Sequence, residues 1–242
     1  MSKDFGSIPE IHYPKKGCKL FQETNDYYGF AHYGWRTKSD FYGYIKGYKE
    51  AGDLVVEVAV TSNDIAKLDA YIFPIVFNYR QFLELSLKSL YLEYSEEDKD
   101  SKTTSINHAS HNLIRMWNKL EHIFISINTS EVHKQMIEDV KSYVFQFQEF
   151  DNNSFTFRYP LTKNLDPTLK EENRLDLRNL RARISELSNF FDGIDGSLDH
   201  IKRAKEDAQE YQREVEADIR AEYEAEMRQM WAEEMRTNIE WE

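Results

Sequence analysis

The chain has few of the residues that break regular structure or cross-link it. Its 242 residues include only 9 Gly and 5 Pro, too few for the many tight turns of an all-β fold. The single cysteine, Cys18, cannot form an internal disulfide, and no charged and apolar leader with a cleavage site opens the sequence, so we expect a cytoplasmic protein. The longest apolar run, residues 71–77, is far shorter than the roughly 20 residues that cross a bilayer. We therefore expect no membrane span.

Acidic residues are in excess. The 43 Asp and Glu against 31 Lys and Arg give a net charge of −12, and a protein of this sign repels phosphate groups. RNA is thus a possible but disfavoured partner, and binding to an anionic membrane is disfavoured as well. The hydrophobic fraction of 40% with 31% charged residues is typical of a globular protein that buries its own core.

Apolar residues recur at helical spacing over most of the chain after residue 38. The pattern predicts helices over residues 39–60, 64–94, 106–126, 131–149 and 173–191, with an exposed polar loop at 95–104. Pro74 predicts a bend in the second helix, and Gly193 predicts the end of the fifth. Alternating aromatic and polar residues at 151–160 predict one extended segment. The fold class is therefore all-α, an up-and-down helical bundle over residues 39–196, and its third helix has an inward stripe of Leu113, Trp117, Leu120 and Phe124.

Residues 1–38 form an irregular, aromatic N-terminal arm in this interpretation. Aromatic side chains at such density are rarely left in water. The arm is predicted to be either a structural cover for the bundle or the wall of a small-ligand pocket.

Residues 197–242 differ in kind, because they predict one long acidic helix. From Asp199 to Glu242 there are 14 acidic and 7 basic residues, and apolar residues recur every four positions, namely Tyr211, Val215, Ile219, Tyr223, Met227, Trp231, Met235 and Ile239. A strict repeat of four drifts by about 40° per step around a helix, so the stripe is not a regular heptad seam. Exposure of Trp231 and Trp241 on such a helix would be costly. We therefore expect the helix to dock on a partner chain, giving a homo-oligomer, or to fold back on the bundle.

No motif in the sequence indicates a metal or a cofactor. His108 and His111 lie three residues apart, but no Cys and no acidic third ligand lies near them, so they do not form a metal-ligand pattern. A phosphate loop, a dinucleotide fingerprint and a nucleophile elbow are all missing. We expect neither a metal nor a cofactor.

Charged residues form a row in the apolar second helix. Arg80, Glu84 and Lys88 follow one another at intervals of four, which puts them on one helix face. The row is either a solvated ion-pair ladder or, if this helix is central in the bundle, an inward cluster that needs further partners. His111 and Arg158 are the candidates for that role.

Three stretches of the chain carry a family resemblance. They are Phe73 to Lys88 (FPIVFNYRQFLELSLK), His111-Asn112-Leu113 with Trp117, and Phe157-Arg158-Tyr159-Pro160. Over about residues 41–191 the chain resembles uncharacterised bacterial proteins with HEPN-like helical domains. The resemblance implies a domain of four or five helices, frequent dimerisation, and a place in prokaryotic conflict systems such as toxin–antitoxin or antiviral defence modules.

Many members of that class are metal-independent ribonucleases. If this chain is one of them, the resemblance implies that their sequence signature is present. The signature is an Arg, usually followed by a polar residue, and a His after four to six intervening residues; the His acts on the ribose 2′-hydroxyl while the Arg holds the phosphate. Arg115 and His122 fit with six residues between them, although Met116 departs from the polar choice and about one such match is expected by chance. Arg80 and His111 form an alternative pair if their helices are adjacent.

These observations predict a HEPN-like protein of a conflict or defence system that acts mainly through protein–protein assembly. The alternative is a metal-independent HEPN-type endoribonuclease. A small-ligand sensor that uses the aromatic arm is a second alternative, and whether the protein is an enzyme stays open at this point.

Overall fold

The structure is a computed structural model that describes residues 12–34, 40–152 and 154–239, with side chains described as far as Trp231. Trp35 and Trp241 lie outside the described residues. The chain divides into two units, Met1–Asp40 and Phe41–Glu242. The second unit holds both the bundle and the long C-terminal helix, and it contains the candidate sites.

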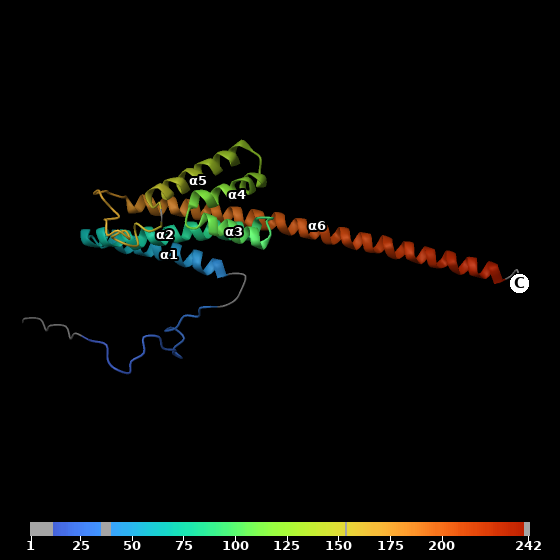
Figure 1. Ribbon diagram of the computed structural model, residues 1–242, viewed down its shortest axis with the longest axis horizontal. Helices are drawn as coiled ribbons and strands as arrows, with labels where there is room; N and C mark the ends of the chain where they lie inside the picture. The colour runs from blue at the N-terminus through green and yellow to red at the C-terminus, as the bar shows by residue number, and fades with distance from the viewer. Residues whose placement is uncertain (1–11, 35–39, 153, 240–242) are drawn as a thin grey trace, which may run out of the picture. The chain divides into compact units, whose positions relative to one another are not determined.

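Six helices make up the described part of the second unit (Figure 1). In chain order they are α1 (Asp40–Thr61), α2 (Ile65–Tyr94), α3 (Lys99–Ala109), α4 (Leu113–Ile127), α5 (Glu131–Phe150) and α6 (Leu177–Ile239). The described residues contain no β-strand, and one isolated bridge joins Leu161 to Pro167. The all-α class is confirmed.

Consecutive helices run in opposite directions, as the contacts between them show. Leu113 at the start of α4 donates its backbone N–H to Gln148 near the end of α5, and the carbonyl of Phe124 near the end of α4 contacts Nε2 of His133 near the start of α5. A short turn joins α1 to α2, and Gly52 of α1 lies against Tyr79 of α2. α2 and α6 run parallel, because α6 first meets α1 at Arg181 and later meets the end of α2, where the Tyr94 hydroxyl donates to Asp195. The arrangement is therefore up-and-down.

The core lies around α2 and α4, which pack on each other and on α6. The predicted inward stripe of α4, Leu113, Trp117, Leu120 and Phe124, is fully buried. The rings of Trp117 and Phe124 lie 6.2 and 5.8 Å from the ring of Phe190 of α6. Each such side chain contributes about 1.5–3 kcal/mol by leaving water, so these contacts fix α6 to the bundle.

Side chains that cap helix starts explain most of the helix boundaries. Asp64, Asp98, Asn112 and Ser130 each accept a hydrogen bond from a backbone N–H in the first turn of α2, α3, α4 and α5. Such caps satisfy donors that have no partner inside the helix. α2 runs through Pro74 as one helix.

The predicted loop at 95–104 is wrong, because α3 occupies most of it. Asp98 caps this helix, and Ala109 is the only residue that α3 buries. The predicted third helix at 106–126 is therefore two helices, which separate at Ser110, where φ is +51°. A surface helix with almost no apolar face gives no periodic signal.

Two further predictions are wrong. The fifth helix does not end at Gly193, since α6 is continuous over 63 residues from Leu177 to Ile239. Turns and bends occupy the described residues of 151–160 in place of an extended segment. Phe157 from this stretch is buried and stacks on Phe150 at 4.9 Å, so the segment closes one end of the bundle.

The first unit is irregular over residues 12–34. The ring of Tyr27 packs edge to face on the rings of Tyr28 and Phe30 at 5.5 and 5.9 Å, and the ring of Phe30 packs on that of His32 at 4.9 Å. The two roles proposed for this arm, cover and pocket wall, stay predictions.

Candidate functional site

The charged row of α2 points into the bundle. Arg80 is fully buried and Glu84 is 4% exposed, because the rest of this helix face packs on α4. The solvated ladder is therefore wrong for these two residues, and the inward alternative is confirmed. Charged groups in such a place need partners.

Arg80 is held by the turn between α3 and α4 and by α5. Its Nη2 donates to the backbone carbonyl of His111 and, at 3.1 Å, to Oε1 of Gln148. Its Nε and Nη1 are buried without a hydrogen-bond partner. Burial lowers the pKa of Arg80, the charges of Glu84 and Asp151 oppose this shift, and the charge of Arg158 adds to it.

Glu84 contacts Lys88 and His111 at the edge of the same cluster. Its Oε1 accepts from Nζ of Lys88 at 2.7 Å and lies 3.0 Å from Nδ1 of His111. An ionised carboxylate can only accept a hydrogen bond, so Nδ1 of His111 is the donor in this contact. The His111 side chain is 52% exposed. This arrangement, a buried carboxylate that orients a half-exposed imidazole, is suited to general acid–base chemistry.

Gln148 was not predicted, yet it connects the cluster. Its Oε1 also accepts from the backbone N–H of Leu113 at 2.7 Å, and its Nε2 donates to the carbonyl of Asn152. The available signal was its position four residues after Val144, on the inward face of α5, where a polar residue is unusual.

The other predicted residues do not join this cluster. The guanidinium of Arg158 lies over the ring of Phe77, 5.9 Å from its centroid. Arg115 donates to the carbonyl of His108 at 3.0 Å, and both Arg115 and His122 are exposed. No described contact links Arg115 to His122, whereas Arg80 meets the backbone of His111. The structure therefore brings together Arg80, Glu84 and His111 only.

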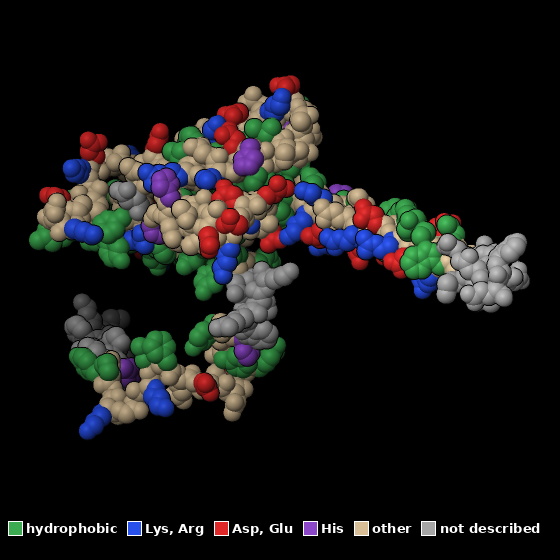
Figure 2. All heavy atoms as spheres, turned by 45° about the vertical axis from the view of Figure 1, so that its right-hand side comes forward, with side chains coloured by type: hydrophobic (Ala, Val, Ile, Leu, Met, Phe, Trp, Pro, Cys, Tyr) green, Lys and Arg blue, Asp and Glu red, His purple; other side chains and the backbone are tan. Residues whose placement is uncertain are grey.

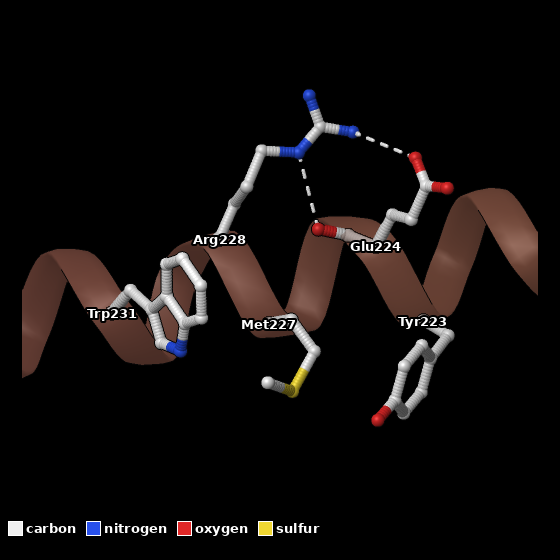
Figure 3. A pocket seen from close by; sticks show the side chains of 5 residues that line it. All are labelled: Tyr223, Glu224, Met227, Arg228 and Trp231. Carbon is white, nitrogen blue, oxygen red and sulfur yellow. Dashed lines mark hydrogen bonds and ion pairs between the residues drawn. The ribbon is translucent and has the colours of Figure 1, made fainter.

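A second candidate site lies on α6, beyond the part that packs in the bundle. Large apolar side chains are exposed there, among them Tyr211, Ile219, Tyr223, Met230 and Trp231, at 60–69%. Tyr223, Met227 and Trp231 line a shallow hollow on this helix; Figure 3 shows Tyr223 and Met227 on one side and the ring of Trp231 lying across the helix. Arg228 and Glu224 pair with each other on the other side at 3.8 Å.

This part of α6 does not fold back on the bundle, because α6 is a continuous helix and nearly every described side chain from 201 to 231 is exposed. The other alternative, docking on a partner chain, stays a prediction. Met235 and Ile239 of the predicted stripe lie beyond the described side chains.

Comparisons with family models, with characterised proteins and with solved structures find no match to this chain. Within the described residues, no cluster of His, Cys, Asp and Glu is arranged to hold a metal ion. Among the described helices, none has an apolar stretch long enough to cross a bilayer.

Proposed function

We propose that this protein is a HEPN-like helical protein of a prokaryotic conflict or defence system that acts through protein–protein assembly, and that α6 is the assembly element. The observation that supports this proposal is the exposed apolar stripe on α6. Its side chains gain nothing from the bundle of their own chain, and large exposed apolar patches are typical of protein interfaces.

The stability of the helix itself supports the same conclusion. Most helical stability in proteins comes from packing of an apolar face, and the described side chains of 206–231 have no contact with the bundle that would provide it. Burial of the stripe against another chain supplies the missing packing. Tyr and Trp, both present here, are enriched at such interfaces.

A single charge on the stripe tests the proposal. Ile219→Glu places a carboxylate at its centre, and Ala217→Glu places the same charge on the opposite face of the same turn. With 28.8 kDa per chain, light scattering of the full chain should give a multiple of this mass for the unchanged protein and for Ala217→Glu, and 28.8 kDa for Ile219→Glu. A mass of 28.8 kDa for the unchanged protein contradicts assembly.

Metal-independent RNA cleavage is the second candidate function, favoured by the Glu84–His111 contact beside Arg80. In this proposal His111 exchanges a proton with the ribose 2′-hydroxyl, and Glu84 stabilises the charged imidazole. Purified protein should cleave single-stranded RNA in EDTA. His111→Ala should reduce cleavage by about 10²–10⁴-fold, as expected for loss of a general acid or base, and His122→Ala tests the alternative pair of Arg115 and His122 in the same assay. Equal activity of His111→Ala, His122→Ala and the unchanged protein excludes both proposed pairs.

A further inference from the structure

Arg80 lies too deep in the bundle to touch a molecule in solvent. Its side chain is 0% exposed, and its Nη2 donates to the backbone carbonyl of His111 and to Oε1 of Gln148. The family resemblance implies an arginine that holds the phosphate of RNA. Because Arg80 has no exposed surface, any effect of Arg80 on a substrate passes through the groups that it holds.

The groups held by Arg80 and Gln148 belong to the backbone of the turn between α3 and α4. The carbonyl of His111 accepts from Nη2 of Arg80, and the N–H of Leu113 donates to Oε1 of Gln148 at 2.7 Å. Ser110, which opens this turn, has a φ of +51°, a conformation that is unfavourable for a residue with a side chain and persists where surrounding contacts fix it. Two buried side chains, from α2 and α5, therefore fix the backbone that carries His111.

The orientation of the Gln148 amide follows from its neighbours. The guanidinium of Arg80 and the N–H of Leu113 are both donors to Oε1, whereas Nε2 donates to the carbonyl of Asn152. Donors can bind only the oxygen of an amide, and acceptors only its nitrogen. A side chain without an oxygen at this position would release the Leu113 N–H and one of the two contacts of Arg80.

The imidazole of His111 has a contact of its own with α2. Nδ1 lies 3.0 and 3.1 Å from the two carboxylate oxygens of Glu84, which follows Arg80 by one helical turn. The His111 side chain is 52% exposed, and histidine side chains reach the surface of the bundle in Figure 2. With Nδ1 on Glu84, Nε2 is the ring nitrogen left for another molecule.

We infer that Arg80 and Gln148 are positioning residues for His111. They hold the turn between α3 and α4 where the imidazole reaches Glu84, and neither of them touches the substrate. This inference rests on the proposed RNA cleavage, and it gives the arginine a role that differs from the one the resemblance implies. His111 meets the ribose, and Arg80 acts through the backbone of His111. Such control is effective because a misplacement of about 1 Å can reduce a rate by about 10²-fold.

Nitrogen-15 spectra of the His111 ring in the full chain test the positioning without RNA. At about pH 9, well above the ordinary histidine pKa of about 6.5, they show which nitrogen of the neutral ring carries the proton, and the signals of His111 are those missing from His111→Gln. In the unchanged protein Nδ1 should carry it, because the ionised Glu84 can only accept. In Gln148→Met, Nδ1-protonated His111 should fall from the major to the minor form.

Two further variants of Gln148 separate the lost contact from a general disturbance. Gln148→Glu keeps an oxygen for Arg80 and Leu113 and should keep the proton on Nδ1. Gln148→Asn is one methylene too short to reach both partners and should behave like Gln148→Met, so it replaces that variant if Gln148→Met does not fold. Gln146→Met is the matched control on the same helix, since exposed Gln146 bonds only to Ser142, and its His111 signals should be unchanged.

Cleavage kinetics test the second half of the inference. In Arg80→Lys and Gln148→Met, kcat should fall by about 10²-fold while KM stays the same, because neither residue binds RNA. A folded Gln148→Met or Gln148→Asn with the proton still on Nδ1 of His111 overturns the inference. A raised KM of Arg80→Lys with unchanged His111 signals places Arg80 on the RNA and overturns it as well. If the unchanged protein does not cleave RNA but the signals shift as expected, the proposed cleavage is wrong and the positioning of His111 stands.

Discussion

Glu84→Gln removes the carboxylate whose charge acts most strongly on the buried guanidinium of Arg80, without changing the shape of the side chain. In the native protein the negative charge of Glu84 offsets part of the effect of burial on Arg80, and its Oε1 accepts from Lys88. The amide keeps one oxygen acceptor, but it leaves Lys88 without its counter-charge and Arg80 with the charge of Asp151 alone. We therefore expect the variant to be less stable at pH 7.

The structure sets the size of this loss. Removal of one partner from a fully buried ion pair costs about 3–5 kcal/mol. The Lys88 side chain is 16% exposed and that of His111 is 52% exposed, so water replaces part of the lost interaction, and we expect about 2–4 kcal/mol. Glu93→Gln is the matched control, because Glu93 pairs with Lys202 at 2.5 Å but is 57% exposed, and an exposed pair contributes about 0–1 kcal/mol.

Urea unfolding followed by circular dichroism measures both losses as differences in the free energy of unfolding. Equal losses in Glu84→Gln and Glu93→Gln would show that the charge of Glu84 does not stabilise Arg80, and the inward cluster would then lose its energetic basis. The same samples serve the RNA cleavage assay. A fall in activity of folded Glu84→Gln would place the carboxylate in the reaction as the group that positions His111.

Three other predictions concern the bundle. Gly52→Ala should destabilise the fold by about 1–3 kcal/mol, because a Cβ at this position would lie 2.6 Å from the ring of Tyr79. Gly47 has open space around it, so Gly47→Ala should stabilise the fold by up to about 1 kcal/mol. Urea unfolding measures both changes. Burial and a hydrogen bond to Asp53 raise the pKa of Tyr79, so its contribution to stability is complete below about pH 10, the ordinary tyrosine value, and is lost as the pH rises further. In a pH series, the free energy of unfolding of Tyr79→Phe should therefore fall less above about pH 10 than that of the unchanged protein. An identical fall would contradict the raised pKa of Tyr79. Asp98→Ala should cost about 1 kcal/mol and speed amide exchange in α3 alone.

The helices with a clear apolar face were predictable from sequence alone. Leu113, Trp117, Leu120 and Phe124 recur at steps of three and four, and all four are buried in the structure, because one stripe on α4 is enough to define its inward face. The meeting of Glu84 with His111 was one of two alternatives. The sequence could not decide between them, since that required knowing that α2 is central in the bundle.

Other features depended on tertiary structure. The apolar signal of α3 is confined to Ile106 and Ala109 near its end, so only the cap at Asp98 marked its first turns as helical. Gly193 predicted a helix end, but Phe190, Phe191, Ile194 and Leu198 around it are buried, and their packing outweighs the weak helix propensity of one glycine. Gln148 joins the cluster through the backbone of Leu113, a contact between residues 35 positions apart that no local pattern reveals.

α6 belongs to two regimes of stability within one unbroken helix. Its first turns share the core with α2, α4 and α5, so their amide hydrogens exchange only when the bundle opens. From residue 206 to Trp231 the backbone hydrogen bonds are supported by local propensity, and they break and reform without disturbing the core. Protection of amides in this outer portion therefore reports directly on whether another chain is bound, and slow exchange there at high protein concentration that disappears on dilution would reveal the dissociation of the complex.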